Sequence, residues 1–175
     1  MTSTSIPASP PPPLDRVIRS VVRRAYAGEA WHGPALAALL ADVDAPTAAA
    51  HPLASAHSVW EIVLHVTAWT REVERRLAGG EPSLPAEGDW PAVVDEGESA
   101  WLATRAALGA AQASLDRAIE AFPAERLGQR VGTSGDASLG TGVSHAGMLL
   151  GLAQHHAYHG GQIALLAKAV AAKGR

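Results

Sequence analysis

The sequence predicts an all-α protein, a four-helix bundle, and two observations point to this class. Apolar residues recur at spacings of three and four over four long segments, whereas no segment shows the strict alternation typical of a half-buried strand. Alanine, the strongest helix former, is abundant, and only 5% of the residues are aromatic. A chain of 175 residues is long enough for one domain with one substantial core.

The first helical pattern follows a proline-rich start. We expect residues 1–13, which end in four prolines, to form a disordered tail, and residues 14–175 to form a single domain. Apolar residues then recur at helical spacing to about Val43. Gly33-Pro34 should kink this helix, because proline removes a backbone hydrogen bond and crowds the preceding turn.

Three further helices complete the predicted bundle. The second starts at Ser55 or Ser58 and ends at Gly79-Gly80, with the charged residues of 71–76 mostly outward. The third covers roughly 93–122, and the fourth runs from Ser144 to the C-terminus. We expect four of the tryptophans to fill the core and its edges: Trp31, Trp60, Trp69 and Trp101. Residues 124–143 form a long glycine-rich connection, a type of segment that often lies over functional sites.

Composition excludes several classes of function. The chain contains no cysteine, which rules out disulfides, thiolate ligands and a cysteine nucleophile. Its net charge is −3 and no basic block occurs, so we expect no nucleic-acid partner. No apolar run approaches the ~18 residues of a membrane span, and the N-terminus lacks the features of a secretion signal. We therefore expect a cytoplasmic protein that binds neither membranes nor nucleic acid.

Polar residues interrupt the apolar face of the fourth helix. His155, His159 and Gln162 continue a stripe that starts with Met148 and Leu152, and buried imidazoles need hydrogen-bonding or metal partners. Histidines at positions i and i+4 lie roughly 6 Å apart on one face, so both rings can reach one ion.

A third histidine belongs to the second helix. His65 lies three residues after Ile62 and four before Trp69, and therefore on the apolar face of that helix. Bundle cores are common places for metal sites built from facing helices. We predict that His65, His155 and His159 bind one divalent transition metal, since three imidazoles suit zinc, nickel, copper or ferrous iron better than calcium or magnesium.

The other histidines give weaker signals. His156 lies beside the pair but off the stripe, which favours a surface position. His51, His57 and His145 lie at helix ends or in loops, where solvated or capping roles are typical. His32 immediately precedes the predicted kink, so it either faces the same cavity or bonds to a carbonyl that the kink frees.

Four segments resemble the DinB-like (DinB/YfiT) superfamily: GEAWHGPAL at 28–36, HSVWEIVLHVTAW at 57–69, DWP at 89–91 and HHAYHGGQIALLAK at 155–168. The resemblance covers roughly residues 14–172, and the last motif is the most specific. It implies a four-helix bundle with a long crossover connection and a three-histidine metal site whose ligands correspond to His65, His155 and His159. Dimers are common in the family, so it also implies a homodimer.

The resemblance implies metal-dependent chemistry on a small molecule. Characterised relatives include thiol-dependent S-transferases and a mycothiol-dependent isomerase, and the founding member is induced by DNA damage. We therefore expect an enzyme that uses zinc, nickel or iron to activate water or a small external thiol; the alternative is a non-catalytic metal- or ligand-binding stress-response protein. Gln162, Tyr158 and His32 are the candidate catalytic residues. With three protein ligands the metal keeps an open position, and we expect it to face a cleft beside residues 28–34 and 124–143.

Overall fold

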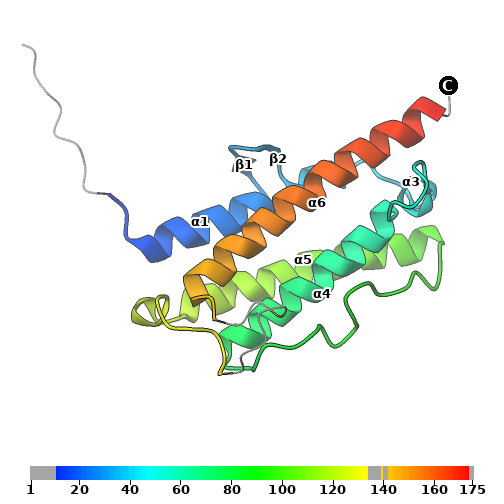
Figure 1. Ribbon diagram of the computed structural model, residues 1–175. Coiled ribbons are helices and arrows are strands. Elements are labelled where there is room, and N and C mark those ends of the chain that lie inside the picture. Colours follow the sequence, from blue (N-terminus) through cyan, green and yellow to red (C-terminus); the bar gives the residue numbers. More distant parts are fainter. Residues whose placement is uncertain (1–10, 134–138, 140–141, 174–175) are drawn as a thin grey trace, which may run out of the picture.

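Four long helices form the protein in the computed structural model, which describes residues 11–133, 139 and 142–173. They are α1 (Leu14–Tyr26), α4 (Val59–Leu77), α5 (Glu98–Ala121) and α6 (His145–Lys173) (Figure 1). The predicted all-α bundle is therefore confirmed. Most of the predicted 1–13 tail lies outside the described residues.

The predicted kinked helix from residue 14 to 43 is wrong, because α1 ends at Tyr26. A two-stranded antiparallel hairpin follows, formed by β1 (Glu29–Ala30) and β2 (Gly33–Pro34), and then α2 (Leu36–Leu39) and α3 (Ala45–Ala49). Gly28 and Gly33 adopt φ angles of 117° and 116°. Residues with a side chain rarely adopt such angles, so these two glycines end the helix and shape the hairpin. The helical spacing of the apolar residues beyond Tyr26 was coincidental.

A long crossover connects α4 to α5. We call its residues 78–97 the strap; it runs back along the length of the bundle, so that α5 begins near the end where α4 began (Figure 1). Such a crossover is the connection that two parallel neighbouring helices require. The helix α5 begins at Glu98 rather than near residue 93, and a 3-10 turn, η1 (Ala124–Arg126), precedes the connection to α6.

Side chains that cap the helices fix where they start. Ser58 and Glu61 form a reciprocal capping box at the start of α4, each bonding the backbone nitrogen of the other. Loss of such an N-cap costs about 1 kcal/mol. Ser144 accepts a 3.0 Å hydrogen bond from the backbone nitrogen of Gly147 and so caps α6 as predicted.

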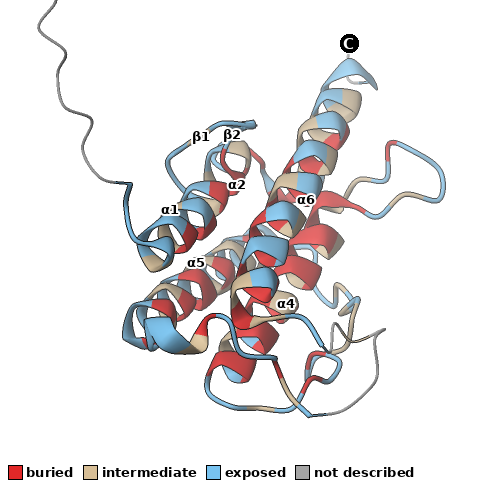
Figure 2. Ribbon diagram, turned by 60° about the vertical axis from the view of Figure 1, so that its left-hand side comes forward, coloured by how far each residue is buried: buried red, intermediate tan, exposed pale blue. Residues whose placement is uncertain are grey.

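Two clusters of buried apolar side chains make up the core, and buried residues line the facing sides of the helices (Figure 2). On α6 the first cluster ends at Ala153 and the second begins at Ile163. His155, His156 and His159 lie between the two clusters. The fold therefore places polar side chains at mid-height in the bundle, with apolar packing above and below them.

Most of the predicted core tryptophans are buried or partly buried, but Trp31 is not. Trp60 and Trp101 are almost fully buried, whereas Trp31 lies fully exposed in the hairpin turn. The two-residue loop that joins β1 to β2 points this ring away from the core, which is why its expected core position is wrong.

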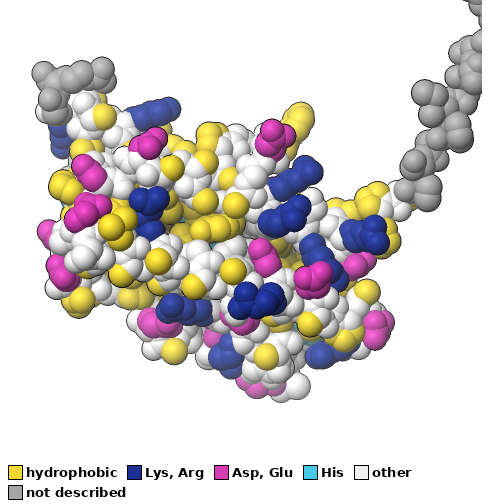
Figure 3. Space-filling view, turned by 180° about the vertical axis from the view of Figure 1, so that it is seen from behind, with side chains coloured by type: hydrophobic (Ala, Val, Ile, Leu, Met, Phe, Trp, Pro, Cys, Tyr) yellow, Lys and Arg dark blue, Asp and Glu magenta, His cyan; other side chains and the backbone are white. Residues whose placement is uncertain are grey.

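The surface carries mixed charges. On the face seen in Figure 3, acidic and basic side chains lie among exposed apolar ones. Within the described part of the chain, no helix is long and apolar enough to cross a bilayer.

Candidate metal centre

Three histidine rings meet between α4 and α6. Nε2 of His155 lies 2.9 Å from Nε2 of His65 and 3.1 Å from Nε2 of His159. His65 and His159 are buried, and His155 is partly buried. One turn of helix separates His155 from His159, and the facing turn of α4 supplies His65, as the two apolar stripes predicted.

Two of the three rings are held in the orientation that a metal ligand needs. Nδ1 of His65 donates to the backbone carbonyl of Asp89 at 2.6 Å, and Nδ1 of His159 donates to Oε1 of Gln162 at 2.6 Å. Both acceptors lack a proton, so the ring proton resides on Nδ1 and leaves the lone pair of Nε2 free. Metal-binding histidines in proteins are held in this way by carbonyl and carboxylate partners.

The spacing of the donor atoms fits a small divalent ion. The ligand atoms of the three residues all lie within 4.8 Å of one another. Two nitrogen ligands of a tetrahedral zinc ion are about 3.3 Å apart, given bonds of roughly 2.0–2.1 Å. These three histidines could therefore hold a metal ion, and among the described residues no other group of histidine or acidic residues meets the same condition.

The charge state of the three rings also suits metal binding. Burial, followed by the nearness of His159 and His65, lowers the pKa of His155 to about 3. Burial also lowers the pKa of His65 and of His159, although their hydrogen bonds to Asp89 and Gln162 act in the opposite direction. All three rings are therefore neutral near pH 7, and only a neutral imidazole can bind a metal.

His156 is buried, contrary to the predicted surface position. Its side chain is fully enclosed, and its Nε2 lies 3.2 Å from the hydroxyl of Thr70 on α4. Burial and the neighbouring His159 lower its pKa to about 4. The helix α6 packs against both α1 and α4, so its buried arc is wider than the single stripe that the sequence predicted.

The remaining histidines lie outside the cluster of His65, His155 and His159, which we call the triad. His145 is at a helix end as predicted but is buried, with Nδ1 donating to the carbonyl of Gln129 at 3.0 Å. His51 and His57 are exposed near Glu61.

The strap covers the triad with residues to which the sequence had assigned no role. The indole of Trp90 stacks on the ring of His65, with centroids 3.9 Å apart, and on its other face stacks His57 at 3.6 Å. Asp89 accepts from His65 through its carbonyl and from Trp69 through Oδ1. Both residues belong to the DWP segment, so the resemblance pointed to this segment without indicating its contacts.

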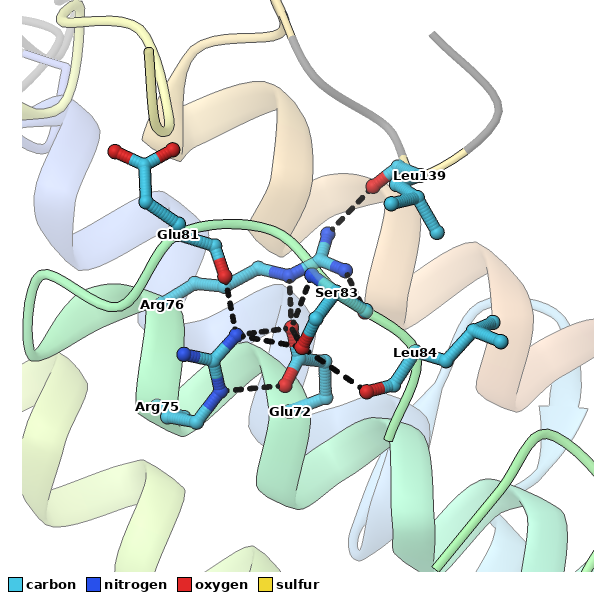
Figure 4. Close-up of polar contacts among 7 residues, drawn as sticks. All are labelled: Glu72, Arg75, Arg76, Glu81, Ser83, Leu84 and Leu139. Carbon is cyan, nitrogen blue, oxygen red and sulfur yellow. Dashed lines mark hydrogen bonds and ion pairs between the residues drawn. The ribbon is translucent and has the colours of Figure 1, made fainter. Parts of the chain in front are cut away.

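A buried ion pair ties the strap to α4, which corrects the prediction that Glu72 and Arg76 face outward. Their side chains are only 2% and 4% exposed, and Nε of Arg76 donates to Oε1 of Glu72 at 2.7 Å (Figure 4). The other two nitrogens of Arg76 donate to the carbonyls of Ser83 and Leu139, and Arg75 also pairs with Glu72. The strap and the glycine-rich connection cover this charged turn, and no periodicity along α4 could reveal that.

The three candidate catalytic residues lie in different places. Gln162 bonds to His159, and its Nε2 lies 3.2 Å from the exposed hydroxyl of Tyr158. His32 is exposed in the hairpin turn. It lines a cavity of about 340 Å³ with α1 and α6, whose described lining includes none of the three ligand histidines. The structure thus brings Gln162 to the triad and places His32 at a separate cavity.

A second cavity, of about 370 Å³, adjoins the triad between α4 and α6 and is open to solvent. Its described lining includes His65 and His155, together with Leu139 from the glycine-rich connection. No residue of 28–34 is among that lining. The expected cleft is therefore present beside the connection, but its expected position beside residues 28–34 is wrong, because the hairpin packs on the α1 side of α6.

Comparisons with known proteins place this geometry in a family. Neither the curated proteins nor the solved structures gave a match to the chain. A family model described as the DinB superfamily matches residues 30–163, a range that includes His65, His155 and His159. Because this match spans well over half of the sequence, the chain belongs to the DinB superfamily.

Proposed function

We propose that the protein is a metal-dependent enzyme that holds one divalent transition metal through Nε2 of His65, His155 and His159. The observation that carries this proposal is the convergence of three Nε2 atoms, two of which belong to rings, His65 and His159, whose Nδ1 is already bonded to a carbonyl oxygen. Neutral rings held in this tautomer favour zinc, nickel or ferrous iron over hard cations.

The reaction class follows from the ligand count and the cavity. A divalent metal on three imidazoles would supply a Lewis acid that lowers the pKa of water or of a thiol toward neutrality. The chain has no cysteine, so any thiol must come from solution. The cavity beside His65 and His155 gives a small molecule access to the ligand cluster. A thiol-dependent transferase or isomerase and a hydrolase both suit this arrangement.

The roles of the chain's own residues can be stated separately. Gln162 positions His159, and the carbonyl of Asp89 positions His65. Trp90 covers one face of His65 and so limits the entry of water from that side. Tyr158 contacts the site in two ways: its hydroxyl lies 3.2 Å from Nε2 of Gln162, and its ring meets the ring of His159 edge-on with centroids 5.1 Å apart.

Cobalt substitution tests whether the site is open. The cobalt-loaded protein should develop sulfur-to-metal charge-transfer bands when 2-mercaptoethanol is added, and its visible bands should change with azide. His156→Ala should behave like the original protein, because His156 is outside the ligand cluster. A spectrum that neither thiol nor azide alters would mean a closed site, and the protein would then be a non-catalytic metal-binding member of its family.

A further inference from the structure

The cavity beside the triad is a trough that follows α4 and α6. On α4 its walls include His65, Trp69 and Val73, and on α6 they include His155 and Met148. These positions recur at helical spacing, so they form one face of each helix. Because one residue adds 1.5 Å along a helix, seven residues from Met148 to His155 span about 10 Å. The trough therefore leads from the ligand histidines toward the far end of the bundle.

The charged groups in the wall already have protein partners. Each of the three side-chain nitrogens of Arg76 donates to a protein oxygen, and its guanidinium lies 5.6 Å from the centroid of the Trp69 ring. Oδ1 of Asp89 accepts from Nε1 of Trp69 at 2.7 Å. An anionic ligand group would lose water without gaining an unpaired cationic side chain in this wall, which is costly. An uncharged apolar group has no such hydration to lose, and it gains contact with Val73, Met148 and Leu152.

Gly151 leaves room at the mouth of the trough. It lies one turn before His155 on α6, is exposed, and lines the cavity. A Cβ built there would meet no atom within 4 Å, and its backbone has no positive φ angle that would require glycine. Glycine inside a helix is less favourable than alanine by about 1 kcal/mol, so this position gives up helix stability and keeps space open.

We propose that this trough binds the uncharged apolar group of the substrate, and that Gly151 sets the largest group it accepts. The volume gives the size class: an apolar cavity of about 150 Å³ holds benzene, so about 370 Å³ admits an apolar group roughly two and a half times as large, such as a naphthyl group that carries a phenyl ring. This inference deepens the proposed function, because it assumes that the reacting atom lies at the three histidines.

A matched pair of dyes tests the inference on the zinc-loaded full chain. N-phenyl-1-naphthylamine is uncharged, and 8-anilinonaphthalene-1-sulfonate adds one sulfonate to the same rings. We expect the uncharged dye to bind, with an increase in fluorescence, about tenfold more tightly than its sulfonate. Equal binding of the two dyes, or no binding of the uncharged dye, would overturn the proposal.

Variants at Gly151 locate the dye. Affinity for the uncharged dye should fall in the order Gly151→Ala, Gly151→Val, Gly151→Leu, reaching about tenfold with leucine because the side chain fills the mouth. Gly161→Leu is the matched control: Gly161 is exposed on the same helix, has no atom within 4 Å of a built Cβ, and is absent from the described cavity lining. This control should bind like the original protein.

The outcomes separate this inference from the proposed function. Unchanged affinity in Gly151→Leu, or equal losses in Gly151→Leu and Gly161→Leu, would overturn the inference. Circular dichroism of each variant shows whether the helices are intact. If only Gly151→Leu disturbs folding, the dye affinities of Gly151→Ala and Gly151→Val still test the inference. If the dye binds in the expected order while thiols and azide leave the cobalt spectrum unchanged, that result would support the apolar site and reject only the proposed enzyme.

Discussion

Nε1 of Trp69 donates a 2.7 Å hydrogen bond to Oδ1 of Asp89. Trp69 on α4 therefore fixes the position of Asp89 in the strap. The carbonyl of the same Asp89 accepts from Nδ1 of His65 at 2.6 Å. Trp69 follows His65 by four residues on one helix face. The helix and the strap therefore form a closed set of contacts that fixes the orientation of the His65 ring.

We predict that Trp69→Phe weakens metal binding without changing a ligand. Phenylalanine keeps an aromatic ring but removes the N–H that holds Asp89, so the affinity for zinc should fall about tenfold, as it does when outer partners of metal ligands are lost. Competition with a chromophoric chelator measures this. Trp60→Phe is the control, because Trp60 on the same helix donates to Thr104 instead. Equal losses in the two variants would contradict the role assigned to Asp89.

The ligand assignment predicts a selective loss of metal. Protein purified without a histidine tag should carry close to one divalent metal per chain, and His65→Ala, His155→Ala and His159→Ala should each retain little of it in elemental analysis. His156→Ala should keep its metal but unfold more easily, by about 1–3 kcal/mol, because it leaves a cavity in the core. Loss of metal from His156→Ala equal to that of the other three would reject the assignment.

A further prediction separates Gln162 from the two other candidate residues. Gln162→Leu removes the acceptor for Nδ1 of His159 and should weaken zinc binding about tenfold. Tyr158→Phe removes only a 3.2 Å contact to Gln162, and His32→Ala changes a residue at another cavity, so neither should alter zinc affinity by more than about twofold. A stronger effect of His32→Ala than of Gln162→Leu would show that His32 acts at the metal.

The buried pair of Glu72 and Arg76 predicts how stability depends on pH. Burial raises the pKa of Glu72, but hydrogen bonds from Arg75, Arg76 and the backbone of Ser83 outweigh burial and hold the pKa below its ordinary value of 4.5. The ionised carboxylate therefore stabilises the fold fully above pH 4.5. This contribution is lost as the pH falls below 4.5 and through the lowered pKa, because the carboxylate then takes up a proton.

Glu72→Gln should cost roughly 3 kcal/mol at pH 7, because it leaves the buried Arg76 without an ionised partner. The difference from the original protein should shrink below pH 4.5, and urea unfolding at several pH values measures it. Glu87→Gln removes a carboxylate from an exposed pair with Arg71 and should change stability by less than about 0.5 kcal/mol. A constant difference across the pH range would contradict the ionic contribution of Glu72.

The ligand cluster was predictable because its information is local. The 3.6-residue period places His155 and His159 on one face and His65 on the apolar face of another helix. In a bundle such apolar faces pack against one another, and this packing does not depend on the conformation of the loops. The same reasoning located Ser144 as the cap of α6 and left two serines, Ser55 and Ser58, for α4, of which Ser58 is the cap.

The tertiary structure alone decided what covers those helices. Glu72 and Arg76 are charged residues on a helix that looks amphipathic, and they are buried because the strap and the glycine-rich connection cover them. His156 is buried because α6 has neighbours on two sides, and Asp89 reaches His65 from 24 residues away along the chain. The period of a helix fixes which side chains share a face, but burial depends on contacts between segments distant in sequence, and no local pattern specifies those contacts.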